Sequence, residues 1–468
     1  MFIFNKQVRL LGKIINVEKN YMNIKTIKSA WILCLLLIVS YHGYSKKSEQ
    51  SVWDTLPQAN KLYDAVIDIN GSGDYRELQQ AIDHAPANRT KPWRIFIKNG
   101  RYNGLVRIPE NKPYIYLIGQ DKQKVIISFM INCGNPDNPK DNGRQYAKAN
   151  FQQAECAAVV VDASDFYAEN ITFENAYGVQ FKSGPQALAI RINKDRTAFY
   201  NCKFRSFQDT WRTSTKAVND RTYADSCWVE GAVDYFYGGG NAYIENTTFY
   251  NVRGGSVIVA PSQKAGTQWG YVFNHCIIDG NKASADGRTK LGRPWHDEPI
   301  AVFLNTIIKI PLAPEGWTDM GPAAKLFAEY NSRDAAGIPI DLSKRRTWYQ
   351  QSKGEGGQRI TGLQAVLTEK QAANYTYQHV IKGSDGWDPV AFFKKPAAVE
   401  GLKRAAGGLK WQKSAGATGY IVYKNGQVIN FAKKTFLKLD AKTAGDYTVS
   451  GVTGNGTLGN VSNTLSIQ

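Results

Sequence analysis

The feature that most constrains the fold is a four-residue pattern that recurs six times between residues 170 and 308. Each copy has a polar residue, a small or β-branched residue, a variable residue and a large apolar residue. Successive copies begin 31, 25, 20, 29 and 30 residues apart. Short apolar strands at such intervals, with Gly and Asn between them, indicate the rungs of a solenoid. The copies begin at Asn170, Asn201, Ser226, Asn246, His275 and Asn305.

Two aspartates occupy equivalent places in consecutive copies. Asp209 lies five residues after Phe204, and Asp234 lies five residues after Val229. Equivalent positions on adjacent rungs of a parallel β-helix are about 4.8 Å apart, so we expect the two carboxylates to be neighbours. Two carboxylates held this close resist ionising together, and the pKa of one should be raised. The pattern therefore predicts a paired acid and base.

The N-terminal segment predicts export from the cell. Residues 30–41 form an apolar run, Lys25 and Lys28 precede it, and the small residues Gly43 and Ser45 follow it. This arrangement is typical of a secretory signal peptide, here over residues 1–45, with Met22 as an alternative start. The run is short for a membrane span. We therefore expect a protein that is secreted, periplasmic or on the cell surface, with no membrane segment after cleavage.

The positive charge of the chain is uneven. The formal net charge is +18, of which residues 1–50 contribute +6, residues 394–468 contribute +8 and residues 51–393 only +4. A basic tail favours contact with a polyanion such as an acidic polysaccharide. A solvated positive surface that aids solubility explains the same composition.

Five cysteines remain once the leader is removed, and an odd number argues against a fully paired disulfide framework. Cys202, Cys227 and Cys276 all take the second place of the repeat. We interpret them as small core residues stacked inside the solenoid. Cys202 and Cys227 would be close enough for a bridge, and the sequence leaves open whether they are joined.

Other elements flank the repeat. Residues 74–85 predict a helix with Asp74 as N-cap, placed to cover the open end of the solenoid. Strands are expected at 94–98, 114–118 and 125–129, and loops with short helices near 331–393. From residue 396 short alternating strands with an Asn425-Gly426 hairpin signal predict a small antiparallel β-sandwich that resembles a fibronectin type III module. We expect the catalytic domain at 60–393 to fold and act without this module, which would serve as a spacer or adhesion unit.

Four strings surround the two aspartates and carry a family resemblance. They resemble, in order and spacing, the signature strings of the pectin methylesterases, or pectinesterases, and the resemblance extends from about Asp68 to Trp348. One such string would be weak, but four on one solenoid are specific. The strings are Gly184-Pro185-Gln186-Ala187-Leu188-Ala189, Phe207-Gln208-Asp209-Thr210, Gly231-Ala232-Val233-Asp234-Tyr235-Phe236-Tyr237-Gly238 and Leu291-Gly292-Arg293-Pro294-Trp295.

The resemblance implies an all-β, right-handed parallel β-helix that hydrolyses the methyl esters of pectin, a methylated polygalacturonate, without metal or cofactor. It implies that Asp234 is the nucleophile and that Asp209 is the acid and base. Gln186 and Gln208 would donate to the oxyanion. Arg293 would pair with Asp234 and help to hold the uronate. The substrate would also meet side chains of three further positions, namely Trp295, Tyr237 and Phe207.

Elementary chemistry fits these roles. An arginine partner keeps a nucleophilic carboxylate ionised, a neighbouring carboxylate raises the pKa of an acid, and amide donors stabilise a tetrahedral oxyanion. The chain departs from the family pattern where Trp211-Arg212 follows Thr210 and where Tyr235 and Tyr237 replace the more common Phe. We expect these changes to alter substrate preference and to leave the reaction itself intact.

Two other classes compete with the esterase. A polygalacturonase-type glycosidase on the same architecture could use two carboxylates about 5 Å apart, although its extra Asp pair and Gly-His-Gly string are missing here. A non-catalytic polysaccharide-binding solenoid would need no acid pair. No Gly-x-Ser-x-Gly string and no metal-spaced histidine cluster occur in the sequence. We expect a monomer that binds no nucleic acid.

Overall fold

The computed structural model describes residues 61–134, 156–439 and 443–468. The signal peptide predicted at residues 1–45, and the alternative start at Met22, lie outside these residues. Within the described part of the chain no helix is long and apolar enough to cross a membrane.

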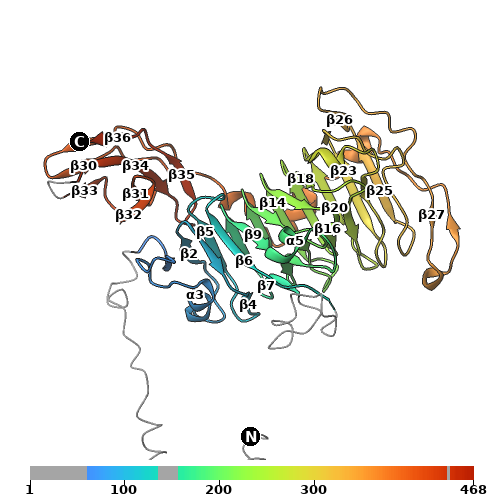
Figure 1. Cartoon of the computed structure of the whole chain (residues 1–468), viewed down its shortest axis with the longest axis horizontal. Coiled ribbons are helices and arrows are strands. Elements are labelled where there is room, and N and C mark those ends of the chain that lie inside the picture. The colour runs from blue at the N-terminus through green and yellow to red at the C-terminus, as the bar shows by residue number, and fades with distance from the viewer. Residues whose placement is uncertain (1–60, 135–155, 440–442) are drawn as a thin grey trace, which may run out of the picture. The chain divides into compact units, whose positions relative to one another are not determined.

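Three parallel sheets build a solenoid, because each strand pairs with the corresponding strand of the next rung (Figure 1). This confirms the predicted parallel β-helix. The ten-stranded sheet contains β1 (Ala65–Ile67), β2 (Trp93–Ile97), β5 (Ile115–Gly119), β8 (Phe166–Glu169), β11 (Thr197–Tyr200), β14 (Arg221–Asp225), β17 (Asn241–Glu245), β20 (Tyr271–Asn274), β23 (Ile300–Leu304) and β25 (Leu326–Tyr330). The nine-stranded sheet contains β3 (Gly100–Asn103), β6 (Val125–Phe129), β9 (Thr172–Asn175), β12 (Lys203–Arg205), β15 (Trp228–Gly231), β18 (Thr248–Asn251), β21 (Ile277–Gly280), β24 (Ile307–Ile308) and β26 (Arg333–Asp334). The seven-stranded sheet contains β4 (Val106–Ile108), β7 (Ala157–Val161), β10 (Leu188–Ile192), β13 (Trp211–Arg212), β16 (Val233–Gly238), β19 (Val257–Pro261) and β22 (Lys290–Gly292).

The first place of the repeat is a turn with left-handed backbone. Asn170 has φ +57° and Asn201 has φ +49°, and the other four copies share this conformation. Few residues with a side chain tolerate it, and Asn is among those that do. The side-chain amide of Asn201 donates to the Asn170 side chain at 2.6 Å, so the turns also bond to one another along the solenoid. The polar position of the repeat therefore marks the corner between two sheets.

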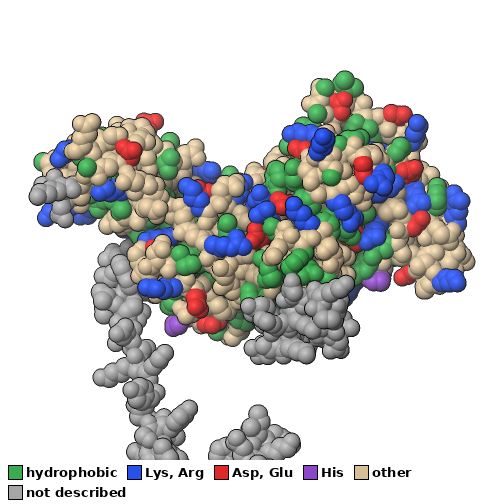
Figure 2. Space-filling view, viewed as in Figure 1, with side chains coloured by type: hydrophobic (Ala, Val, Ile, Leu, Met, Phe, Trp, Pro, Cys, Tyr) green, Lys and Arg blue, Asp and Glu red, His purple; other side chains and the backbone are tan. Residues whose placement is uncertain are grey.

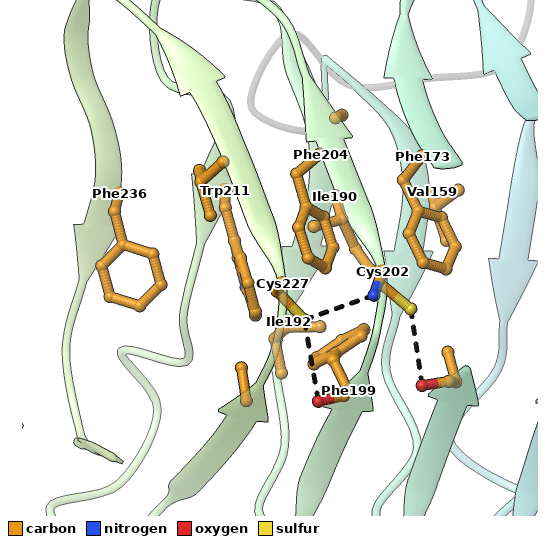
Figure 3. Close-up of a cluster of buried hydrophobic side chains, with 14 of the residues drawn as sticks. Val159, Phe173, Ile190, Ile192, Phe199, Cys202, Phe204, Trp211, Cys227 and Phe236 are labelled. Atoms are coloured by element: carbon orange, nitrogen blue, oxygen red, sulfur yellow. Dashed lines mark hydrogen bonds between the residues drawn. The ribbon is translucent and has the colours of Figure 1, made fainter. Parts of the chain in front are cut away.

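The second and fourth places fill the interior. The fourth residues pair in register from Phe173 through Phe204 to Ile308, and all are buried. Cys202 and Cys227 lie beside Phe204 and Trp211 in this core (Figure 3). The stacked cysteines of the repeat are free thiols, so the bridge left open by the sequence is not formed. A disulfide joins Cys133 and Cys156 instead.

The capping helix is shorter than the sequence predicts. Helix α3 spans Leu78–His84 and buries Leu78 and Ile82 against the first rung. The expected N-cap, Asp74, instead accepts a hydrogen bond from the Val66 backbone N–H at 2.8 Å. Tyr75 forms a bridge with Ile67, which keeps this stretch extended. The prediction of Asp74 as N-cap was wrong because β-pairing claims the residues before Leu78.

Irregular structure follows β25, as the sequence predicts. Helix α6 (Glu369–Ala372), the π-helical turn η6 (Gln378–Lys382) and the 3₁₀ turn η7 (Pro389–Phe392) lie on the side of the solenoid. Here the Tyr377 ring packs edge-on against Tyr223 at 5.2 Å. The remaining elements of this region are the 3₁₀ turn η5 (Lys353–Glu355) and the hairpin of β27 (Tyr349–Gln350) and β28 (Arg359–Ile360).

The C-terminal residues form two antiparallel sheets around a separate core. At the hairpin turn that the sequence predicts, Asn425 has φ +51° and Gly426 has φ +74°, the two positive values that a tight turn requires. The first sheet contains β29 (Lys403–Ala405), β30 (Gly408–Lys410) and β33 (Phe436–Lys438). The second contains β31 (Gly419–Lys424), β32 (Gln427–Ala432), β34 (Gly445–Val452), β35 (Leu458–Val461) and β36 (Leu465–Ile467).

This module packs directly on the solenoid. The Phe431 ring lies 5.9 Å from Tyr63 and 5.5 Å from Phe96. The Tyr63 hydroxyl donates to the Gly456 carbonyl at 2.7 Å. The buried carboxylate of Glu169 accepts from the Leu458 backbone N–H at 3.2 Å. Solenoid and module therefore share one hydrophobic cluster.

These contacts lead us to expect that a chain cut after Lys395 unfolds or aggregates, contrary to the separability that the sequence suggests. Exposing a buried aromatic side chain costs about 1.5–3 kcal/mol, and whole domains are stable by only about 5–15 kcal/mol. Thermal unfolding of the cut and full chains is the measurement.

Two substitutions in the full chain separate this docking from general damage to the module. Phe431→Ala should lower the melting temperature, whereas Phe436→Ala, at an exposed position of the same module, should leave it unchanged. A cut chain that melts at the same temperature as the full chain would show that the shared cluster contributes nothing to stability.

Basic side chains occur on both the solenoid and the C-terminal module. On the face that Figure 2 shows, Lys and Arg side chains are spread over both regions, and acidic side chains are visible among them in each. The concentration of net charge in the tail thus reflects the scarcity of acids there, with three acids among residues 394–468.

Candidate active site

The two aspartates predicted to pair lie on adjacent rungs of the solenoid. Gln208 forms a parallel bridge with Val233, so the residues that follow, Asp209 and Asp234, are side by side. The Asp209 backbone N–H donates to the Val233 carbonyl at 2.9 Å. The spacing between rungs then places the backbones of the two aspartates about 4.8 Å apart.

Both aspartates adopt the left-handed backbone conformation. The φ angle is +64° at Asp209 and +48° at Asp234. Asp is one of the few residues besides Gly that tolerates this region. Because both residues share this torsion, both side chains depart from the regular alternation of a strand, and in the same direction. The shared left-handed torsion therefore sets the alignment of the pair.

Arg293 binds Asp234 through two hydrogen bonds. Its Nε donates to Asp234 Oδ1 at 2.8 Å and its Nη2 donates to Oδ2 at 2.5 Å. The arginine follows β22, and its backbone N–H donates to the Val259 carbonyl at 3.0 Å. A two-pronged pair of this kind fixes the orientation of the carboxylate and favours its charge. The predicted Arg293–Asp234 contact is thus present in the structure.

Burial and charge separate the two carboxyl groups. Loss of hydration on burial, together with the nearby charge of Asp234, raises the pKa of Asp209 to about 8. Burial also raises the pKa of Asp234, but there the hydrogen bonds and charge of Arg293 act in the opposite direction. Asp209 also lies beside the charge of Asp234 and, within the described residues, has no arginine bound to it. The raised pKa of Asp209 therefore favours its protonated form, while Arg293 favours the charged form of Asp234.

Aromatic side chains surround the pair. The Tyr237 hydroxyl donates a hydrogen bond to Asp209, and its ring meets Trp295 edge-on at 5.4 Å. Trp295 is half-buried, whereas Phe207 is only 3% exposed and lies beneath the Arg253 guanidinium at 5.5 Å. Tyr237 and Trp295 also belong to a small apolar cluster on the outside of the seven-stranded sheet. Of the three side chains predicted to meet substrate, Trp295 offers the most surface.

The two glutamines flank the aspartates on neighbouring rungs. The Ala187 backbone N–H donates to the Gln208 carbonyl at 3.1 Å. Gln186 and Gln208 therefore lie on adjacent rungs. Both side chains are half-buried. Within the described residues neither side-chain amide has a hydrogen-bond partner. Their N–H groups therefore remain available to a bound group.

Sequence reasoning gave no role to Arg212 and did not name Lys264. Arg212 pairs in register with Tyr237, one rung away, and its charge acts on Asp209. A pocket of about 380 Å³ beside Trp295 is lined by Arg212 and Lys264, and also by Asp297 and Glu355. Arg212 could have been found from the strand alternation, since Trp211 points into the core and its neighbour must point outward. Lys264 lies in a loop and has no such signal.

Metal ligands do not gather anywhere in the described residues. No group of three or more His, Cys, Asp or Glu side chains there could hold an ion.

Residues 64–384 match the family model of the pectinesterases. The chain belongs to the pectinesterase family. A pectinesterase of Petunia integrifolia is 28% identical over 340 residues, which cover 68% of this chain and 84% of that protein. Pectinesterase 31 of Arabidopsis thaliana is 32% identical over 268 residues, covering 56% and 80%. This pectinesterase is therefore a carboxylic ester hydrolase, and the matched range ends before the C-terminal module.

Solved structures share the fold of this pectinesterase. The pectin methylesterase from carrot has a TM-score of 0.58 at 23% identity and covers 71% of this chain and 97% of its own. The pectin methylesterase from Erwinia chrysanthemi has a TM-score of 0.53 at 23% identity and covers 70% and 98%. These likenesses confirm the parallel β-helix as the architecture.

Proposed function

We propose that this pectinesterase hydrolyses the methyl esters of polygalacturonate to methanol and pectate at the Asp209–Asp234 pair. The observation that carries the proposal is that the two carboxyl groups have different environments. Asp234 is bound by Arg293, whereas the pKa of Asp209 is raised. An ionised carboxylate beside a protonated one supplies both a nucleophile and an acid. An ester hydrolase needs both.

In the first half-reaction an oxygen of Asp234 attacks the ester carbonyl carbon. The carbonyl oxygen takes up the electron pair, and the side-chain N–H groups of Gln186 and Gln208 stabilise this oxyanion. As the tetrahedral intermediate collapses, the bond to the methoxy oxygen breaks and Asp209 gives that oxygen its proton. Methanol leaves, and the acyl group remains on Asp234 as an anhydride.

In the second half-reaction Asp209, now a carboxylate, takes a proton from water. The water oxygen attacks the acyl carbon, and the bond to Asp234 breaks with return of the electron pair to that carboxylate. Free uronate leaves, Asp209 is protonated again and Asp234 is restored to its ion pair with Arg293. The cycle consumes one water molecule and needs no group that the chain does not supply.

The surroundings of the pair suit a uronate polymer. Trp295 presents an aromatic face, and Arg212 and Lys264 bring positive charge to the adjoining pocket. A pectin methylesterase structure of the same fold, 23% identical to this chain, is a complex with a hexasaccharide. We take pectin as the substrate on these grounds together with family membership.

Release of methanol is the direct test of this function. The protein should liberate methanol from highly methylated pectin in step with new carboxylate, and nothing from unmethylated polygalacturonate. Chain length should stay constant. Shortening of unmethylated polymer without methanol would favour the polygalacturonase-type glycosidase, and binding without either product would favour the non-catalytic solenoid.

The pH profile should report Asp209. Because this group must be protonated to act as the acid, kcat/KM should fall as pH rises through about 8. The hydrogen bond from Tyr237 favours the ionised form of Asp209 and so lowers its pKa. Tyr237→Phe should therefore move the alkaline limb to higher pH.

Tyr235→Phe is the matched control for this shift, since the Tyr235 hydroxyl bonds Asn251 at 3.2 Å within the core. It should leave the alkaline limb where it is. A limb that stays in place in Tyr237→Phe, or that moves to lower pH, would rule out Asp209 as its source.

We further propose that the chain is exported by the signal peptide at residues 1–45 and that residues 396–468 are a fibronectin type III-like module. The leader proposal is supported by the basic flank and apolar run. The module proposal is supported by the two antiparallel sheets. Mass spectrometry of the N-terminus of exported protein tests the first of these.

A further inference from the structure

The three-stranded sheet of the C-terminal module has an outward face rich in lysine. Register pairs Lys403 with Lys410 and Lys410 with Phe436 across β29, β30 and β33, and it pairs Lys438 with Gly408. Directly paired residues, and residues two apart on a strand, lie on the same face. The other face is buried through Leu409 in the core of the module. We call the outward set, Lys403, Lys410, Phe436 and Lys438, the lysine face.

The charges of this face are unfavourable in the protein alone. Lys403 and Lys410 are directly opposite each other, and like charges in that position destabilise a sheet. None of the three strands contains an Asp or Glu. Among the described residues no ion pair neutralises any lysine of the face. An anionic ligand would relieve this repulsion.

An exposed aromatic side chain stands in the same row. Phe436 is 42% exposed. Its ring can pack against the C–H face of a sugar while the neighbouring ammonium groups meet carboxylates. Uncharged sugars would satisfy only the ring, and small inorganic anions would satisfy only the lysines. The combination fits a polymer of sugar acids.

We propose that the lysine face binds de-esterified polygalacturonate. The choice of polymer rests on the proposed function, because that reaction turns uncharged methyl esters into carboxylates. Binding would therefore strengthen wherever the solenoid has already acted. The module would hold the protein on processed polymer while unprocessed esters remain within its reach.

Migration through native gels that contain polymer tests this proposal with the whole protein. Unesterified polygalacturonate should retard the protein strongly and highly methylated pectin only weakly. Lys410→Glu removes one attraction and adds one repulsion, so affinity for polygalacturonate should fall about ten-fold. The same change turns a like-charged pair into an opposite-charged one, so the melting temperature should stay constant or rise. If Lys410 acted only in folding, the affinity and the melting temperature would fall together.

Lys282→Glu is the matched control, since it changes net charge equally at an exposed position on the solenoid. Its affinity should equal that of the unchanged protein. Equal weakening by Lys282→Glu, full retention by Lys410→Glu, or equally tight binding of dextran sulfate would each overturn the proposal. Salt should weaken the interaction, because the Debye length is only about 8 Å at physiological ionic strength.

Binding and turnover fail separately in this design. Lys410→Glu should weaken binding to polygalacturonate in the Asp234→Ala protein by the same factor as in the unchanged protein. A protein that binds polygalacturonate through Lys410 but releases no methanol would refute the proposed function and leave the lysine face intact. Methanol release with no effect of Lys410→Glu on binding would do the reverse.

Discussion

Asp234→Ala is expected to abolish methanol release from methylated pectin. The substitution removes the carboxylate that Arg293 binds and that we propose as the nucleophile. It also leaves the Arg293 guanidinium half-buried without its partner. Any remaining activity should not exceed direct attack of water on the ester, helped only by the hydrogen-bond donors that are left. Methanol measured over hours at high protein concentration gives the limit.

Folding must be checked beside this loss, because alanine does not favour the left-handed backbone at residue 234. Forcing a residue with a side chain into that region costs about 1–2 kcal/mol. Asp234→Asn is the better-matched variant, since Asn tolerates the turn and keeps the shape. It should be equally inactive with a smaller change in melting temperature. Near-normal turnover by either variant would refute the covalent mechanism.

Asp209→Asn should lower kcat by about 10²–10⁴-fold, the usual contribution of a positioned acid or base. The amide cannot protonate departing methanol or activate water. KM should change little, because the substitution keeps the size of the side chain and the conformation of the turn. The remaining activity should lose its alkaline limb near pH 8. A raised KM with unchanged kcat would instead assign Asp209 to substrate binding.

Much of the solenoid could be predicted because its core repeats. Phe173, Phe204 and Val229 share one register position, and the residue three places earlier is the turn that needs Asn or a similar residue. Local chemistry and global fold agree there, so a short pattern locates strand, face and corner. The same argument places Asp209 beside Asp234 from the sequence alone.

Elements without a local signature were missed. Asp74 looks like a helix cap, yet pairing of Tyr75 with Ile67 keeps it extended. The contact of Phe431 with Tyr63 and Phe96 joins residues more than 300 positions apart, and neither side announces its partner in the sequence. Likewise no pattern shows that Tyr237 donates to Asp209, because that bond depends on how two rungs stack.

The left-handed backbone positions of the solenoid have a consequence for how such a site can arise. A left-handed position that accepts Asn also accepts Asp, so a carboxylate can enter there with little disturbance to the backbone. Two such replacements on successive turns would create a pair whose separation is fixed by the repeat itself. The solenoid therefore offers equivalent positions at equal spacing along its axis. Chemistry could be moved along it by whole turns without redesigning the framework that carries it.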